Sequence, residues 1–506
     1  MSDAAPQVTL RPATAADRDW FWSVNNAPDV RRQSVRPEPI PYADHCRWFA
    51  ARLDDPRTQL FVVEVAAKPV GVLRCDLDDA APDAVLSLAL ADGQRGRGLG
   101  RAAVRLASDA LLTRPDVARV LARIRPDNAA SMRAFAAAGF DPAGAVTQDG
   151  VALSGYERRR AAPAAPATVL LRCDGDRRVG FGHAMRCSAL ASALEAYGVR
   201  GQFLLRAAEP SVAERLRTAG HTVTTVPPDA DEVATLAAAL TACGAAALVV
   251  DSYRVTAAEL AAVRARRSVR TLVIDDLADR RLGCDVVVNP NPWATAADYA
   301  GWGATAICCG PRFAPLRPDL HQSRWPARAL DPALPRVLLT LGGSQLGAEL
   351  LPLVQALDAL TRPFQLALLV GSDADAASLR RLAATARHRI EVHAGIGAVA
   401  ELFHRVDLAV SAAGTTCFEL AACGVPALLL IGADNQRRGA AAWQDAGVFH
   451  CLGALGAVAP QTLAHHVDQA LADPSALARR SQAAQNLVDG RGAARVARAL
   501  FQPLRK

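Results

Sequence analysis

The part of the chain from residue 168 to residue 503 alternates short apolar runs with helix-like stretches. Continuous apolar runs of this length are typical of parallel strands covered on both faces, and their alternation with helices is typical of doubly wound α/β sheets. The runs lie at 168–174, 201–207, 247–253, 271–277, 284–290, 336–343, 364–371, 408–413 and 427–433. They predict two parallel-sheet halves in tandem, with a ligand bound outside the carboxyl ends of the strands.

Two proline-rich segments divide the chain. The stretch "AAPAAPAT" alternates proline with alanine, which suits neither a helix nor a central strand. A softer break, "RWPARALDPALP", spans 324–335. We therefore expect a first domain at 1–160, a linker at 161–167, and two lobes at 168–325 and 326–506.

Composition excludes several classes of partner. The net charge is +7, and almost all of the basic residues are arginine. No run of basic residues is interleaved with aromatic residues, so no nucleic-acid partner is expected. The eleven cysteines contain no C-x-x-C spacing, which predicts reduced thiols, a cytoplasmic location and no metal site. Neither a signal peptide nor an apolar run of the ~20 residues that a membrane helix needs is present, so no membrane partner is expected.

The first domain contains a glycine-rich turn between a strand-like run, "AVLSLAL", and a helix-like run. Glycines let a backbone approach a ligand closely, and free amides at a helix start attract phosphate. Downstream, Asn128 and Ser131 precede a helix-like stretch that ends in "GF". The candidate cofactor-binding residues are Arg95, Gly96, Arg97, Gly98, Leu99, Gly100, Arg101 and Asn128.

This pattern resembles the pyrophosphate loop, [QR]-x-x-G-x-[GA], of the GNAT N-acetyltransferases. The earlier stretches "NNAPDVRRQS" and "DHCRWFAARL" are similar to those of the acyltransferases that modify amino-sugar nucleotides, and the resemblance as a whole covers most of residues 5–158. The resemblance implies acetyl-CoA as co-substrate. Phe135 stands where many members have the tyrosine that protonates the departing thiolate, and phenylalanine cannot do so. The general acid and base therefore stay unassigned, and a degenerate acyltransferase fold that serves as an interaction module is the alternative.

The stretch "RVGFGHAMRC" places His183 between a glycine loop and a helix, after a strand. Histidine titrates near neutral pH, so its imidazole can accept a proton at working pH. We expect the helix N-terminus to lower the pKa of His183 and keep the neutral base. The alternative is a structural histidine with no part in chemistry.

In the last lobe, the turn "SAAGTT" opens a helix after a strand, which is suited to a diphosphate because amides and hydroxyls converge there. Glu419, one turn along, can accept hydrogen bonds from both hydroxyls of a ribose. The strand-end pairs Gly342–Gly343 and Asn435–Gln436 complete the set, and Asn435 is a candidate to orient water or sugar. A strand-end threonine alone is usually only a helix cap.

In this order the elements resemble the two-lobed GT-B-like architecture that binds UDP-sugars. The match is closer to the UDP-2,4-diacetamido-2,4,6-trideoxy-β-L-altropyranose hydrolases of pseudaminic acid synthesis, over about residues 168–503. Arg172, Asp174, Gly180, Gly182, His183, Arg186 and Cys187 fall on that family's signature, followed by "VVDSY", "IDDLADR", "VVNPN", "LRPDL", "LGGS" and "ADNQ". Gln345 departs from the family's usual aspartate.

The resemblance implies that His183 activates a water that attacks the anomeric carbon, with loss of UDP and inversion. The candidate substrate-binding residues are Arg172, Asp174, Gly182, Asp251, Tyr253, Gly342, Gly343, Gly414, Thr415, Thr416, Glu419, Asn435 and Gln436. The fold class expected is α/β, with an N-terminal GNAT domain followed by a GT-B-like hydrolase of two doubly wound parallel-sheet halves.

The two resemblances fit consecutive steps of one pathway, which are N-acetylation of the 4-amino UDP-sugar and then hydrolysis. Tethering raises the local concentration of substrate at the second site, so a bifunctional enzyme is expected. Its partners would be the UDP-amino-sugar, acetyl-CoA and other enzymes of the pathway. The alternatives are a glycosyltransferase similar to the lipid II-forming enzyme, and a binding module with an inactive acyltransferase.

Overall fold

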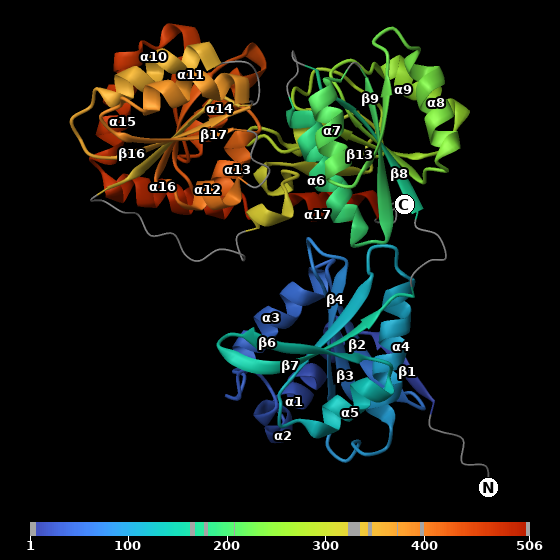
Figure 1. Ribbon diagram of the computed structural model, residues 1–506. Helices are drawn as coiled ribbons and strands as arrows, with labels where there is room; N and C mark the ends of the chain where they lie inside the picture. Colours follow the sequence, from blue (N-terminus) through green and yellow to red (C-terminus); the bar gives the residue numbers. More distant parts are fainter. Residues whose placement is uncertain are drawn as a thin grey trace. The chain divides into compact units, whose positions relative to one another are not determined.

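The computed structural model describes residues 7–161, 167–176, 181–206, 208–321, 334–342, 347–371, 373–394 and 399–501. The chain divides into two compact units, the first extending to Ala164 and the second beginning at Ala165. The expected linker at 161–167 and the break at 324–335 lie mostly outside the described residues. Each unit is described by itself below (Figure 1).

The first unit is a mixed sheet in the order β1-β2-β3-β4-β5-β7-β6. Only β4 and β5 pair in parallel, and every other neighbouring pair in this sheet is antiparallel. Its elements are β1 (Val8–Pro12), α1 (Arg18–Asn25), α2 (Pro28–Arg32), α3 (Tyr42–Asp54), β2 (Thr58–Val65), β3 (Lys68–Leu77), β4 (Asp83–Leu90), α4 (Leu99–Thr113), β5 (Arg119–Ile124), α5 (Ala129–Ala137), β6 (Asp141–Gln148) and β7 (Val151–Arg159).

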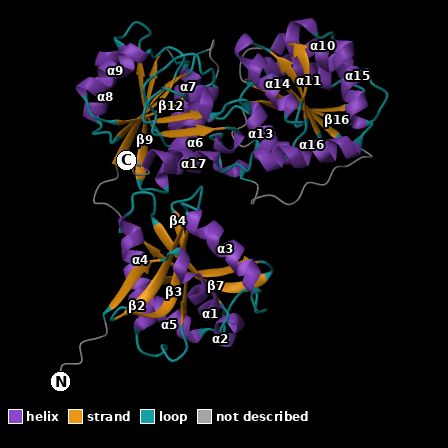
Figure 2. Cartoon of the chain, turned by 180° about the vertical axis from the view of Figure 1, so that it is seen from behind, coloured by secondary structure: helices purple, strands orange, loops and turns teal. Residues whose placement is uncertain are grey.

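The second unit begins with a parallel sheet in the order β10-β9-β8-β11-β12-β13-β14. Helices cover both of its faces (Figures 1 and 2). Its elements are β8 (Ala167–Asp174), α6 (Gly182–Glu195), β9 (Val199–Arg206), α7 (Pro210–Thr218), β10 (Thr222–Val226), α8 (Glu232–Ala242), β11 (Ala247–Asp251), α9 (Ala257–Arg266), β12 (Arg270–Ile274), β13 (Val286–Asn289) and β14 (Ala306–Cys309).

A second parallel sheet follows in the order β17-β16-β15-β18-β19-β20. Its elements, with the C-terminal helices, are β15 (Arg336–Thr340), α10 (Gly347–Asp358), β16 (Gln365–Val370), α11 (Asp373–Ala383), β17 (Arg389–Ala394), α12 (Ala400–His404), β18 (Leu408–Ala412), α13 (Thr416–Ala422), β19 (Ala427–Ile431), α14 (Arg437–Asp445), β20 (His450–Ala454), α15 (Pro460–Leu471), α16 (Pro474–Leu487) and α17 (Gly492–Phe501).

The central strands are buried on both faces. In β15, Val337 and Leu339 enter one core with α10, α11 and α15, whereas Leu338 enters the opposite core with α12, α13 and α16. Because successive strand side chains point to opposite faces, a strand with helices on both sides must be apolar at every position. The two predicted doubly wound halves are confirmed by this topology.

Helix starts are set by local capping. Asp231 accepts a hydrogen bond from the Ala234 amide at the start of α8, and Thr256 and Glu259 form a reciprocal capping box at α9. These side chains satisfy amides that have no intrahelical partner. They fix the points at which the chain turns back from the sheet edge, which is where the polar residues of the second unit gather.

Candidate functional site

His183 lies in the first turn of α6, the first described helix after β8. β8 pairs in parallel with β11, and Cys173 stands opposite Asp251. The carboxyl ends of neighbouring parallel strands share one sheet edge, so the segment after β8 meets the end of β11. His183 Nδ1 lies 2.5 Å from Asp251 Oδ1, and both side chains are buried.

This contact fixes which imidazole nitrogen is basic. Nδ1 of His183 also lies 3.2 Å from the backbone carbonyl oxygen of Asp251. Both neighbours are acceptors, so Nδ1 carries the proton and Nε2 holds the lone pair of the neutral ring. The hydrogen bonds of His183 that the structure describes all involve Nδ1.

Arg186 follows one turn later on α6 and joins two carboxylates. Its Nε and Nη2 atoms donate to the two oxygens of Asp251 at 2.5 and 2.7 Å. Its Nη1 and Nη2 atoms donate to the two oxygens of Asp276 at 2.8 Å each. Asp276 follows β12 and also accepts a 2.8 Å hydrogen bond from the Tyr253 hydroxyl.

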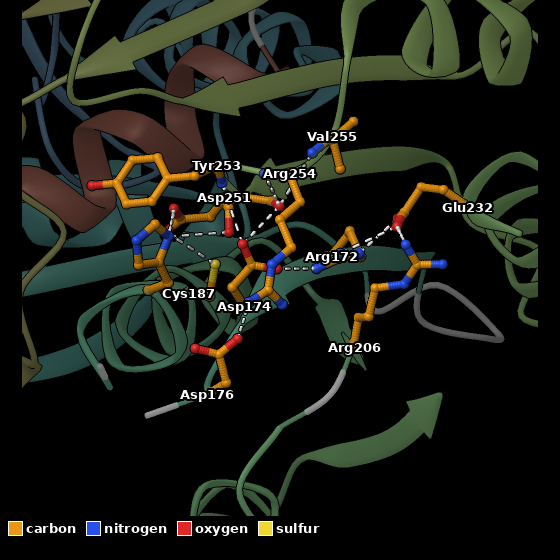
Figure 3. Close-up of polar contacts among 12 residues, drawn as sticks. Arg172, Asp174, Asp176, Cys187, Arg206, Glu232, Asp251, Tyr253, Arg254 and Val255 are labelled. Atoms are coloured by element: carbon orange, nitrogen blue, oxygen red, sulfur yellow. Dashed lines mark hydrogen bonds and ion pairs between the residues drawn. The ribbon is translucent and has the colours of Figure 1, made fainter. Parts of the chain in front are cut away.

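The Tyr253 ring stands edge-on to the His183 ring, with 4.7 Å between centroids. The loop that carries Tyr253 is held from two sides. Asp174 accepts from the Ser252 hydroxyl at 2.8 Å and the Tyr253 amide at 3.2 Å. Arg280 donates to the backbone carbonyls of Ser252 and Tyr253. Figure 3 shows Asp251, Tyr253 and Asp174 gathered at this edge.

The carboxylate reverses the expected direction of the His183 pKa. Burial opposes the charged imidazolium, but the attraction of Asp251 outweighs it and raises the pKa of His183. Burial would likewise raise the pKa of Asp251, yet Arg186 and His183 hold it well below its usual range. The prediction of a lowered His183 pKa is therefore wrong. That prediction considered only the helix dipole, which is equivalent to about half a charge. It did not include the full negative charge of Asp251, whose Oδ1 lies 2.5 Å from His183 Nδ1.

Arg172 and Asp174, two predicted substrate ligands, are fully buried. Arg172 donates to Asp174 at 2.9 Å and to Glu232 at 2.7 and 3.2 Å, and Arg206 pairs with Glu232 at 3.1 Å (Figure 3). A buried charge needs such partners because leaving it unpaired is costly. This burial favours a role in holding the Tyr253 loop over direct contact with a substrate.

The second lobe brings its own predicted residues to this edge. A Cβ added to Gly182 would lie 3.0 Å from Thr415 Cγ2 and 3.1 Å from Thr415 Oγ1. Thr415 is the N-cap of α13 and Thr416 its first residue. Gly182 therefore gives clearance to the chain of the second lobe. Gly182 as a substrate-binding residue stays a prediction, since the neighbour that the structure describes is Thr415.

Three further predicted residues lie around α13. Gln436 Nε2 lies 3.7 Å from the place of a Cβ on Gly414, while Gln436 Oε1 accepts from the Gly432 amide at 2.9 Å. Burial and the nearby Asp276 raise the pKa of the Tyr253 hydroxyl, and a hydrogen bond with the exposed Asn435 opposes this shift. The structure thus joins Asn435 to the His183 cluster.

Glu419, the predicted ribose ligand, has a side chain that is 24% exposed and faces Arg317, whose Nη2 lies 3.4 Å from Oε1. Burial raises the pKa of Glu419, and Arg317 opposes this shift. Gly342 follows β15 with a φ of +90°, and a Cβ there would meet open space. Gly343 and Gln345 lie outside the described residues, as does Gly180.

In the first unit, the predicted loop joins β4 to α4. Gly98 is the N-cap of α4 with a φ of +75°, and Gly96 has a φ of +76°, conformations that L side chains rarely adopt. A Cβ at either position would meet no atom within 4 Å, so the loop is open on its outer side. The first amides of α4, which have no intrahelical partner, begin at this open loop, and their contact with a pyrophosphate stays a prediction.

The other loop residues have different surroundings. Arg95 pairs with Asp29 at 2.9 Å, and Arg97 donates to Gln94 at 2.7 Å. Leu99 is buried in the core of the first unit. Gly100 would place a Cβ against Leu88 and Leu90 of β4, and Arg101 is exposed.

β4 and β5 diverge beside this loop. They pair only from Asp83↔Arg119 to Val85↔Leu121, although β4 continues to Leu90 and β5 to Ile124. The backbone groups of β4 beyond Val85 that would face β5 are therefore available to an extended ligand. This opening lies at the end of β4 that leads into the glycine loop.

Asn128 and Phe135 differ in the polar groups that they could offer to a bound co-substrate. Asn128 caps α5, and its side-chain oxygen accepts from the Ser131 amide at 3.0 Å, so that oxygen is already engaged. Phe135 is buried edge-on against Phe140, with 5.1 Å between ring centroids. Cofactor contact by Asn128 would have to use its amide nitrogen, and Phe135 offers no proton.

Within the described residues, no group of three or more histidine, cysteine or acidic side chains is arranged to hold a metal ion. In the same part of the chain, no helix is both long and apolar enough to cross a membrane. None of the eleven cysteines forms a disulfide.

Known protein families match a part of each unit. Residues 7–141 match the model of the acetyltransferase (GNAT) domain, and residues 337–496 match that of the glycosyltransferase family 28 C-terminal domain. The chain joins a GNAT acetyltransferase domain to a GT-B-like region. The GNAT domain therefore contains the loop at Gly98, and the family 28 domain contains Thr415, Glu419 and Asn435.

No curated relative matches the chain. Among solved structures, the aminoglycoside acetyltransferase AAC(6')-Ib with coenzyme A is 20% identical over 30% of this chain and 95% of its own, with a TM-score of 0.28. Spermidine N-acetyltransferase from Vibrio cholerae, with CoA and spermine, is 16% identical over 30% and 96%, with a TM-score of 0.29. MurG from Acinetobacter baumannii is 17% identical over 64% and 96%, with a TM-score of 0.48.

Proposed function

We propose that the chain is a bifunctional sugar-nucleotide enzyme. Its GNAT domain transfers an acetyl group from acetyl-CoA to the 4-amino group of UDP-4-amino-4,6-dideoxy-N-acetyl-β-L-altrosamine. Its second unit then hydrolyses the product, UDP-2,4-diacetamido-2,4,6-trideoxy-β-L-altropyranose, and releases UDP. Two separately matched domains in one chain support a bifunctional sugar enzyme, and the sequence signature around His183 supports hydrolysis.

The contact between His183 and Asp251 carries the hydrolytic half of the proposal. Asp251 holds the proton on Nδ1, so Nε2 accepts a proton from a water molecule. The water oxygen bonds to the anomeric carbon as the bond to the UDP oxygen breaks, and the configuration inverts. Asp251 stabilises the imidazolium that forms, without itself taking the proton.

The leaving diphosphate is assigned to the second lobe. The turn at Gly414, Thr415 and Thr416 offers amides and hydroxyls, and it lies within the family 28 match. Glu419 is assigned to the ribose hydroxyls and Asn435 to orientation of the water or sugar. The approach of Thr415 to Gly182 supports this division of work, because it brings the diphosphate turn to the helix that carries His183.

For acetyl transfer, the turn at Gly96–Gly98 and the first amides of α4 hold the diphosphate of acetyl-CoA, whose thioester supplies the activated acetyl group. The opening between β4 and β5 aligns the extended arm of this co-substrate. The amine forms a bond to the thioester carbonyl carbon, and the carbon–sulfur bond breaks. Alignment supplies much of the rate, because the thioester is already activated. The nitrogen loses one proton to bulk water as the amide forms, and bulk water supplies the proton of the departing thiol, since Phe135 has no proton to give.

A glycosyltransferase with an accessory acyltransferase domain is the second candidate, favoured by the family 28 match itself. It would transfer the sugar to an acceptor hydroxyl rather than to water. Incubation of the full chain with the diacetamido UDP-sugar and no acceptor separates the two. The hydrolase releases UDP and free sugar with many turnovers, whereas a glycosyltransferase leaves the nucleotide sugar intact.

A further inference from the structure

The guanidinium group of Arg186 lies between two carboxylates, that of Asp251 and that of Asp276. Arg186 makes four charge-assisted hydrogen bonds of 2.5 to 2.8 Å, two to Asp251 and two to Asp276. Asp251 then contacts His183, and Asp276 accepts from the Tyr253 hydroxyl. Arg186 is itself buried and the chain of contacts passes through it.

The charges of this cluster balance only when the imidazole is protonated. Arg186 contributes one positive charge, and Asp251 and Asp276 contribute two negative charges. With neutral His183 the cluster has an excess negative charge, which a proton on the imidazole removes. In a buried site with weak solvent screening, this balance stabilises the imidazolium that water activation creates.

We propose that Arg186 is a positioning residue that locks Asp251 against His183 and Asp276 against Tyr253, and so sets both the orientation and the proton affinity of the His183 imidazole. As a role in catalysis, this inference rests on the proposed hydrolysis. As a statement about His183, it stands on the geometry of the cluster.

The geometry calls for arginine rather than lysine. A planar guanidinium presents several N–H donors in fixed directions and can serve two carboxylates at once, whereas an ammonium is a compact point charge. Arg186→Lys therefore keeps the charge but loses at least one of the two bidentate contacts. Arg186→Met keeps most of the length and loses the charge.

The charged groups around His183 predict opposite effects for two variants. Arg186 lowers the pKa of His183, and Asp276 raises it. Arg186→Met should therefore raise the pKa of His183, and Asp276→Asn should lower it. The ionisable groups that act on His183 from the described elements are Asp251 at the end of β11, Asp276 in the loop after β12 and Arg186 on α6, and the Tyr253 ring packs against it from the loop after β11. The Cys187 thiol on α6 contacts Asp251 at 3.7 Å.

The test is a pH titration of His183 in the full chain with 13C-labelled histidine, assigned with His183→Asn. The inference expects a higher titration midpoint in Arg186→Met and a lower midpoint in Asp276→Asn. Arg186→Lys should keep a midpoint near the wild-type value. Affinity for UDP, measured by calorimetry, confirms that each variant has folded.

UDP release is then followed across pH. If the chain hydrolyses the UDP-sugar, the acid limb of the pH profile of kcat should move in each variant in the same direction as the titration midpoint of His183. In Arg186→Lys, kcat should fall at least 10-fold while the acid limb of its pH profile stays in place. Unchanged midpoints in folded Arg186→Met and Asp276→Asn, or midpoints displaced in the same direction, would overturn the inference. If Arg186→Met fails to bind UDP, an unchanged titration midpoint of His183 in Asp276→Asn is enough to overturn the inference. Displaced midpoints with no UDP release from the wild type would instead reject the proposed hydrolysis.

Discussion

His183 Nδ1 lies 2.5 Å from Asp251 Oδ1, a contact that ties the first turn of α6 to the carboxyl end of β11. The two residues are 68 positions apart and meet because β8 and β11 are parallel neighbours. The contact turns an isolated histidine into a base with one defined tautomer. It also places the basic nitrogen, Nε2, on the side of the ring away from the carboxylate.

Removing the charge of Asp251 should change the pH dependence of UDP release. Asp251 raises the pKa of His183, and the base works only when deprotonated, so activity rises with pH through this pKa. In Asp251→Asn the pKa falls, and the acid limb of kcat should move to lower pH. The plateau rate should fall by about 100-fold or more, because the tautomer is no longer held. An acid limb that stays in place would contradict this role for Asp251.

Removing the imidazole should separate the two activities. His183→Ala should lower the rate of UDP release by about 1,000-fold, within the usual range for a general base. CoA release by the GNAT domain should be unchanged, as should affinity for UDP. The matched control is His221→Ala, because His221 also contacts α6, through the Ser188 hydroxyl at 2.9 Å, but makes no contact with the cluster at Asp251. Equal losses of UDP release in both variants would count against a catalytic His183.

In the two parallel sheets of the second unit, the strands predicted from the sequence are the central ones, and the strands that were not predicted lie at the sheet edges. β10 and β14 flank one sheet, and β17 and β20 flank the other. Their residues are mostly half-exposed, as in "TVTTV" and "RIEVHA", whereas central strands such as β11 are buried at every position. An edge strand is covered on fewer sides and lacks the continuous apolar run that marks a central one.

The site was predictable in part for a related reason. Polar residues at strand ends, such as Asp251 and Asp276, stand out against apolar runs, and parallel topology brings them to one edge. Their individual roles were not predictable. Whether Asp174 faces a ligand or the buried Arg172 depends on neighbouring side chains, and the direction of the His183 pKa depends on a distance.

The glycine loop of the GNAT domain can be tested with a conformational control. Gly98→Ala places a side chain at a φ of +75° and should cost about 1 kcal/mol in the free energy of unfolding of this unit. It should also raise KM for acetyl-CoA at least 10-fold, because the amides of α4 would shift. Gly144 has a φ of +84° and open surroundings in β6, so Gly144→Ala should have the same stability cost and leave KM unchanged. A normal KM in folded Gly98→Ala would argue against the loop as the CoA site.

Glu419 should discriminate between ribose and deoxyribose. If its carboxylate accepts from the ribose hydroxyls, wild-type protein should bind UDP about 10-fold more tightly than 2′-deoxy-UDP, a difference of about 1.4 kcal/mol. Glu419→Gln should weaken the binding of UDP and bring the affinities for UDP and 2′-deoxy-UDP closer together. Calorimetric titration with both nucleotides measures it. A ratio that persists in Glu419→Gln would assign the ribose to another residue.

Mass analysis of one reaction separates the proposed bifunctional enzyme from the alternatives. The full chain is given acetyl-CoA and the 4-amino UDP-sugar, and all sugar species are followed over time. The expected outcome is CoA, UDP and the free 2,4-diacetamido sugar from the wild type, and the acetylated UDP-sugar as the stable end product of His183→Ala. CoA release by the wild type with the acetylated UDP-sugar left intact would contradict it.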